Sequence, residues 1–200
     1  STLSNDTNTK TMSGNLLVSK KITTIANNTF LDCTTLTGIT LPKVQKIGQY
    51  AFQRCSGLAS IQLSDNLTYI DSFAISYCTS LTSIVLPDSL TSTSIGVFCN
   101  NTALTSVRLP ETMTLIRNTM FQGCSSLVSI HLPDAITGIG ESAFKDCALT
   151  SIQLPTSLEW MENIVFEGNQ IEKIVLPASF RLFSPGAFGY ISAFRGNPIK

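Results

Sequence analysis

The sequence predicts a strand-dominated solenoid, a coil of about eight stacked rungs in which each rung is one short sequence repeat. Two observations support this prediction. The dipeptide Leu-Pro, replaced once by Leu-Ser, recurs in steps of 22 or 23 residues from Leu41 to Leu176. An Ala-Phe pair then appears, followed by a cysteine three residues after the Phe, as in Ala51, Phe52 and Cys55 and again in Ala143, Phe144 and Cys147.

The repeat unit reads L-x-x-I-x-L-P-x-x-L-x-x-I-x-x-x-A-F-x-x-C-x-x. Seven copies begin at Leu36, Leu58, Leu81, Leu104, Leu127, Leu149 and Ile171, and a partial copy with Leu17, Ile22, Ile25, Phe30 and Cys33 precedes them. One unit cannot bury its apolar side alone, so neighbouring units must stack and share a core. The expected fold is therefore an α/β-type leucine-rich-repeat solenoid.

The first segment of each unit, L-x-x-I-x-L, has the alternation of a strand with one buried face. Stacked copies of this segment predict a parallel sheet on the concave face of the coil. Proline then ends the strand, because it cannot donate a ladder hydrogen bond. On the other sides, L-x-x-I predicts a second short extended segment and Ala-Phe predicts a single 3₁₀ or helical turn.

Two columns of side chains are expected inside the coil. The rings of the Ala-Phe pairs form one buried stack, with the members Phe30, Phe52, Phe98, Phe121, Phe144, Phe166 and Phe188, and Ile75 in the third place. Cys33, Cys55, Cys78, Cys124 and Cys147 form the second column, where Asn101 and Asn169 replace cysteine and from which Cys99 is absent. Stacked side chains point in parallel and hold Cβ atoms about 4.8 Å apart, beyond disulfide reach, so these cysteines are predicted to be reduced and structural.

The repeats assign residues 14–190 to the solenoid, residues 1–13 to a polar linker or N-terminal tail, and residues 191–200 to a C-terminal cap or a truncated repeat. Basic and acidic residues cancel at 13 each without a basic cluster, which disfavours nucleic acid as a partner. No apolar run is long enough to span a membrane. We expect no enzyme, cofactor or metal site, because no catalytic constellation or closely spaced Cys/His pairs occur.

The unit resembles the BspA-type leucine-rich repeat of bacterial and protozoan surface proteins. Leu-Pro, Ile-Gly and Ala-Phe-x-x-Cys occur in that family's order, as in Ile139-Gly140 and Ala143 to Cys147. The resemblance implies an extracellular or cell-surface location and a non-catalytic adhesion module that recognises a protein or glycan partner. The alternative is a structural spacer within a larger surface protein. The family motif consists of core positions, so it transfers no binding residues.

Outward positions of three consecutive strands give the candidate contact surface. They are Arg108, His131 and Gln153, with Ser106, Ser129 and Ser151 beside them. The planar donor fork of Arg108 suits a carboxylate, a sulfate or a peptide carbonyl. Rows of small hydroxyls are also typical of any solvent-facing strand, so the pattern alone leaves both interpretations open. Trp160 marks a rival surface, as a contact anchor or as a ring lying flat over its neighbours.

Overall fold

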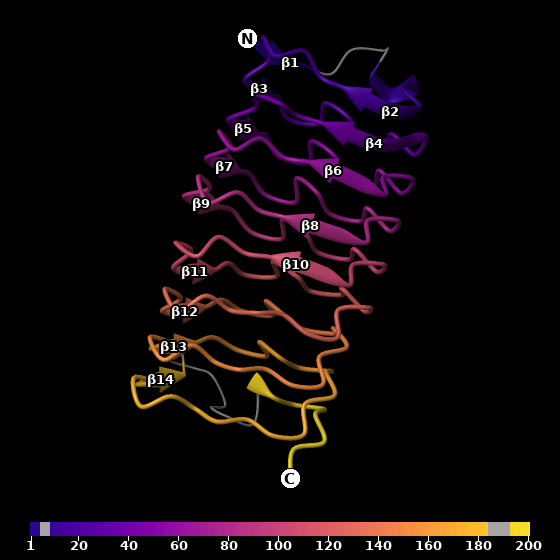
Figure 1. Cartoon of the computed structure of the whole chain (residues 1–200). Coiled ribbons are helices and arrows are strands. Elements are labelled where there is room, and N and C mark those ends of the chain that lie inside the picture. The colour runs from indigo at the N-terminus through magenta and orange to yellow at the C-terminus, as the bar shows by residue number, and fades with distance from the viewer. Residues whose placement is uncertain (5–8, 184–192) are drawn as a thin grey trace.

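The predicted solenoid is confirmed by a computed structural model, which describes residues 1–4, 9–183 and 193–200. The chain winds into a stack of rungs, with its N-terminus at one end and its C-terminus at the other (Figure 1). All strand pairs are parallel. Phe188, expected in the ring stack, lies outside the described residues.

The first segment of each repeat forms what we call the strand face. Its strands are β2 (Gly14–Leu17), β4 (Leu36–Thr40), β6 (Ser60–Gln62), β8 (Ser83–Val85) and β10 (Ser106–Arg108), paired in the orders β2-β4-β6 and β8-β10. The central residue of β6, Ile61, is buried and both its neighbours are exposed, as the alternation predicted. No strand is assigned to the equivalent stretches 127–132, 149–154 and 171–176, so the predicted sheet is interrupted.

The second extended segment is confirmed as a second ladder. It comprises β1 (Thr2–Leu3), β3 (Thr24–Ile25), β5 (Lys46–Ile47), β7 (Tyr69–Ile70) and β9 (Ser92–Thr93), followed by β11 (Leu115–Ile116), β12 (Gly138–Ile139), β13 (Trp160–Met161) and β14 (Leu182–Phe183). Each strand has two residues, and Figure 1 shows these strands stacked along one edge of the coil. Ladder hydrogen bonds therefore join consecutive rungs on this side as well, except between β9 and β11, which are not paired.

The Ala-Phe segments form the turn side of the coil, and here the expected helical turn is wrong. Helical structure in the described residues is confined to η1 (Thr9–Thr11) and the single residue Ala193. Hydrogen bonds alternate instead: the Phe52 N–H donates to Ala74 O of the next rung, at 2.7 Å, and the Gln53 N–H donates locally to Tyr50 O, at 3.2 Å. Tyr50 and Arg54 have φ of 56° and 59°. A right-handed helix cannot continue through left-handed residues.

The predicted ring stack is confirmed in the centre of the coil. Neighbouring rings lie 5.0–5.6 Å apart and nearly parallel, in the pairs Phe30–Phe52, Phe98–Phe121, Phe121–Phe144, Phe144–Phe166 and Phe166–Phe194. Ile75 is buried and fills the place between Phe52 and Phe98. Phe194 therefore follows Phe166 in the stack.

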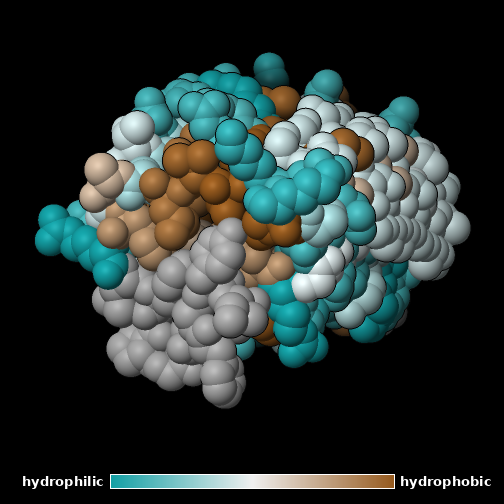
Figure 2. Space-filling view, turned by 90° about the horizontal axis from the view of Figure 1, so that it is seen from below, coloured by the Kyte–Doolittle hydropathy of each residue, from teal (hydrophilic) through white to brown (hydrophobic). Residues whose placement is uncertain are grey.

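The C-terminal end of the coil presents apolar surface beside a polar rim (Figure 2). In the last repeat, Val175 is 69% exposed, and Ile174 and Leu176 are half-buried. The equivalent leucines of inner repeats, such as Leu86 and Leu109, are buried. The last repeat thus covers its apolar positions less completely than the inner repeats do.

Candidate functional site

The six candidate residues occupy outward positions on three consecutive rungs of the strand face, as predicted. Ser106 and Arg108 flank the half-buried Val107 in β10. The same alternation leaves Ser129 and His131 exposed on the next rung, and Ser151 and Gln153 on the one after it. The side chains of these six residues are therefore open to a partner.

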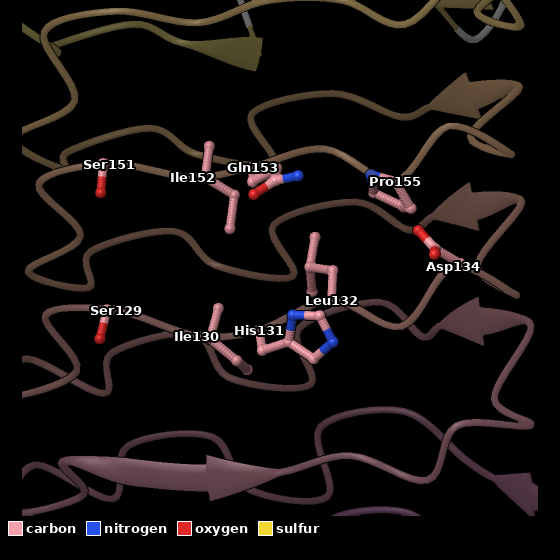
Figure 3. A pocket seen from close by; sticks show the side chains of 9 residues that line it. All are labelled: Ser129, Ile130, His131, Leu132, Asp134, Ser151, Ile152, Gln153 and Pro155. Atoms are coloured by element: carbon pink, nitrogen blue, oxygen red, sulfur yellow. The ribbon is translucent and has the colours of Figure 1, made fainter.

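A hollow of about 310 Å³ lies between the last two of these rungs. It is lined by Ser129, Ile130, His131, Leu132, Asp134, Ser151, Ile152, Gln153 and Pro155. Figure 3 shows the two serines at one end, the His131 ring and Gln153 near the middle, and Asp134 and Pro155 at the other end. Four of the six predicted residues thus border one cavity.

The hollow exists because the strand ladder is open at this point. Backbone bonds join the two rungs as far as Val128, whose carbonyl accepts from the Thr150 N–H at 3.2 Å. Within the described part of the chain, no backbone hydrogen bond joins residues 129–132 to residues 151–155. In contrast, β8 and β10 pair in full register from Ser83↔Ser106 to Val85↔Arg108. The open rungs therefore expose backbone polar groups to solvent or to a partner.

Arg108 is not part of this hollow. Its Nη2 pairs with Asp88 at 3.1 Å, and its Nη1 donates to Leu86 O at 3.2 Å. It lines a second hollow, of about 550 Å³, together with Ser60, Ile61, Gln62, Leu63, Asp65, Ser83, Val85, Pro87 and Asp88. This hollow lies between β6 and β8, which are not paired, so it too marks a break in the ladder. The structure separates Arg108 from His131 and Gln153.

An acidic row borders both hollows and was missed in the sequence reasoning. Asp65, Asp88, Glu111 and Asp134 are all exposed and occupy one repeat position, directly after the Pro or Ser that ends the strand segment. The signal was available as four carboxylates in four consecutive repeats. Of these four carboxylates, Asp88 alone forms an ion pair among the described residues, with Arg108. The other three are not neutralised in this way, so this edge of the strand face carries local negative charge.

Trp160 belongs to the second ladder, away from the hollows. It is half-buried in β13, and its indole lies so close to Gly138 of β12 that any side chain at residue 138 would overlap the ring. This contact supports the interpretation of Trp160 as a ring lying over its neighbours.

The six cysteines are free and buried, and five of them lie in the predicted column. Burial raises the pKa of the Cys55 thiol to about 12, with the neighbouring Cys33 adding to the effect. Burial also raises the pKa of Cys147 to about 12. A nucleophilic cysteine needs a lowered pKa and access to solvent, which is the opposite arrangement.

The described residues contain no group of three or more His, Cys, Asp or Glu side chains placed to hold a metal ion. None of the helices formed by residues 1–4, 9–183 and 193–200 is long and apolar enough to cross a membrane.

Stacked short repeats, parallel ladders on two sides and a shared apolar core define the class of this protein, a leucine-rich-repeat solenoid. The chain belongs to the BspA type leucine rich repeat family, whose model matches residues 7–128 and 115–196 in six copies. No curated protein is significantly similar to the chain in sequence.

Three solved structures show how far the likeness extends. A leucine-rich repeat protein from Eubacterium ventriosum has a TM-score of 0.74 at 22% identity, over 93% of this chain and 59% of its own. One from Bacteroides ovatus has a TM-score of 0.66 at 23% identity, over 90% and 58%. A leucine rich cell surface protein from Faecalibacterium prausnitzii has a TM-score of 0.54 at 27% identity, over 88% and 40%.

This chain therefore spans under three fifths of the length of these three proteins. The first two structures support the fold alone. Neither the family model nor these structures indicate an enzyme.

Proposed function

We propose that the chain is a non-catalytic adhesion module at a cell surface and that its strand face binds a protein partner. The observation that carries this proposal is the open ladder beside the acidic row. Two hollows, of about 310 and 550 Å³, interrupt the strand face and are bordered by Asp65, Asp88 and Asp134. The similar protein from F. prausnitzii is a leucine rich cell surface protein, which supports the location.

The chemistry of the hollow favours an extended protein segment with basic side chains. Ser129, His131, Ser151 and Gln153 offer hydrogen-bonding groups, and the unpaired backbone of the two rungs offers further donors and acceptors. The carboxylate of Asp134 attracts a cationic group at the end of the hollow. A glycan contact on this face and a structural spacer are the competing functions.

Arg108 and Ser106 extend this contact to the preceding rung. The Arg108–Asp88 pair is exposed, with 48% and 60% of the two side chains accessible, so breaking it costs at most about 1 kcal/mol. A carboxylate or carbonyl of the partner can therefore replace Asp88 as the acceptor of the guanidinium.

A library of random peptides displayed on phage tests the proposal with the purified chain as bait. We expect the enriched peptides to be rich in Lys and Arg, and their binding to weaken as salt rises. Substituting His131 and Gln153 together by Ala lowers the affinity more than about ten-fold because both side chains line the hollow, and Arg108→Ala does the same because Arg108 extends the contact to the preceding rung.

Trp160→Ala is the control variant, because Trp160 lies on the second ladder. Loss of binding in this variant alone would move the contact to that side of the coil. Failure to enrich any peptide would support the spacer, and enrichment without basic residues would remove the role of the acidic row.

A further inference from the structure

We propose that a hollow on the turn side is a binding site for a neutral glycan. The hollow has a volume of about 410 Å³ and is lined by Tyr50, Gln53, Phe73, Tyr77, Cys99, Asn100, Thr119 and Gln122, from four consecutive repeats. None of these residues belongs to the strand face. The site therefore does not depend on the function proposed for that face.

The depth of the hollow comes from the residues that directly follow the stacked ring position. Gln53, Ser76, Cys99 and Gln122 occupy this position in consecutive repeats. Ser76 and Cys99 are short and buried, and the longer Gln53 and Gln122 stand on either side of them. Two short side chains between two long ones leave a depression whose length matches two or three rungs, about 10–15 Å.

Aromatic rings form the walls. Tyr50 and Phe73 stack with ring centroids 5.8 Å apart, at an interplanar angle of 18°. In the next repeat, the position equivalent to Phe73 is Gly96, which has a φ of +63°. The Phe73 ring lies against the Gly96 backbone, so any side chain at residue 96 would overlap the ring. Tyr77 is 44% exposed and belongs to the opposite column of left-handed residues. Ring surface thus remains available to a ligand.

Polar groups complete the lining. The Gln53 amide donates to Ser76 Oγ at 3.1 Å, which fixes its orientation. Gln122 is half-buried, and its side-chain amide forms no hydrogen bond in the part of the chain that the structure describes. It offers two donors and an acceptor to a ligand. Asn100 adds a third amide, and Thr119 adds a hydroxyl.

These features together select the class of ligand. No lining residue is charged near neutral pH, and burial raises the pKa of the Cys99 thiol, which keeps it neutral. A charged ligand would lack a counter-charge, and a purely apolar one would leave the amides unpaired, at a cost. A neutral pyranose presents an apolar C–H face to a ring and hydroxyls to planar amides. The volume is within the range of small-ligand sites.

Titration calorimetry with neutral trisaccharides built from glucose, mannose or galactose tests this site in the whole chain, with sialylated and sulfated trisaccharides as charged comparisons. We expect saturable binding of at least one neutral sugar. Tyr77→Asn lowers its affinity about five- to ten-fold through loss of ring contact. Gln122→Ala lowers it about three- to ten-fold through loss of a hydrogen bond.

Asn is chosen at residue 77 because Asn100, the next residue in that column, has the same left-handed φ of 58°. Arg54→Asn is the matched control: Arg54 occupies the same column but does not line the hollow, so binding stays unchanged. The proposal is overturned if no neutral sugar binds, if only charged sugars bind, or if Tyr77→Asn has no effect. Loss of sugar binding in Gln153→Ala would also overturn it, because the sugar would then lie on the strand face.

Discussion

At the scale of single residues, two positions in each repeat whose turn side is described have a left-handed backbone, four residues apart. Asn28 and Asp32 show the pair with φ of 58° and 64°, and Phe73 and Tyr77 show it with φ of 55° and 57°. Glycine, asparagine and aspartate tolerate this region, whereas bulky or β-branched residues are strained there. The chain nevertheless places Ile164 in it, with φ of 48°.

Ile164→Asn is expected to stabilise the protein by about 1 kcal/mol, because left-handed strain in a β-branched residue exceeds this amount. Asn28 occupies the same repeat position and shows that asparagine fits there. Thermal unfolding measures the gain as a higher Tm. The reciprocal change, Asn28→Ile, should lower stability by a similar amount. A loss of stability in Ile164→Asn would mean that the half-buried isoleucine makes apolar contacts worth more than the strain.

The buried thiols make the free energy of unfolding decrease as pH rises in the alkaline range. Burial raises the pKa of Cys55 and of Cys147 from 9.0 to about 12, so both thiols stay protonated in the fold while the unfolded chain releases their protons. Their contribution is complete below about pH 9 and decreases as pH rises toward 12, by up to about 1.4 kcal/mol per pH unit for each thiol.

Urea unfolding at several pH values checks this dependence. Cys147→Asn removes one titrating thiol and introduces the residue that Asn169 already provides in the same column. We expect the variant to lose less stability than the natural sequence between about pH 9 and 11. Identical losses in the two proteins would show that the thiol does not contribute.

At the scale of structural elements, the cysteine column is a row of hydrogen-bond donors. Cys55 Sγ donates to Phe30 O at 3.0 Å, and Cys124 and Cys147 donate in the same way to Phe98 O and Phe121 O, both at 3.2 Å. Each donor thus satisfies a backbone carbonyl of the preceding ring position. Asn169 does the same through Nδ2, which bonds Phe144 O at 2.7 Å. This shared bond explains why asparagine replaces cysteine singly.

Asn101 accepts a hydrogen bond from the backbone in addition to donating one. Its Nδ2 donates to Ile75 O at 2.9 Å, and its Oδ1 accepts from the Cys78 N–H at 2.7 Å. Asn101→Ala leaves both backbone groups buried and unpaired, which should cost about 2–4 kcal/mol. Asn101→Cys keeps the bond to Ile75 and should cost about half as much. Urea unfolding compares the two, and an equal loss would mean that the thiol does not replace the amide donor.

The repeat pattern was sufficient to predict the elements but not the openings between them. Ile130 and Ile152 have the same alternation as Ile61, so the sequence predicted a strand at all three places. Only Ile61 lies in an assigned strand. The alternation of polar and apolar side chains predicts which face of a segment is buried. It does not predict whether the backbones of two neighbouring rungs form hydrogen bonds with each other. The outward direction of His131 was therefore predictable, and the hollow beside it was not.

The turn side was misjudged for a related reason. Ala-Phe with a following cysteine has the apolar spacing of a short helical turn, and Tyr50 or Ile164 does not signal a left-handed residue as glycine does. The aromatic hollow depends on those left-handed positions, since they turn Tyr50 and Tyr77 outward on either side of the ring column. It became visible only once the backbone was known.

At the scale of the whole molecule, the breaks in the two ladders are staggered. On the strand face the ladder is interrupted between β6 and β8, and on the second ladder it is interrupted between β9 and β11. The rung of residues 104–126 spans the second break, because its β10 pairs back to β8 and its β11 pairs forward to β12. Among the described rungs, no boundary is open on both sides, which favours one cooperative unit in a chain of nearest-neighbour contacts.

Phe121 is the ring of that connecting rung, stacked on Phe98 at 5.6 Å and on Phe144 at 5.5 Å. Phe121→Ala should cost about 3–5 kcal/mol, the range for emptying a buried aromatic site. It should also weaken the coupling between the two halves of the coil, so that urea unfolding broadens or divides into two transitions. Phe30→Ala, at a ring whose described stacking partner is Phe52 alone, provides the comparison. Its loss of stability should be confined to the first rungs, as hydrogen exchange can show, and its main transition should stay sharp. If Phe121→Ala lost less than about 1 kcal/mol, or if the two variants unfolded with equally sharp transitions, the rung of residues 104–126 would not be the link between the two ladders.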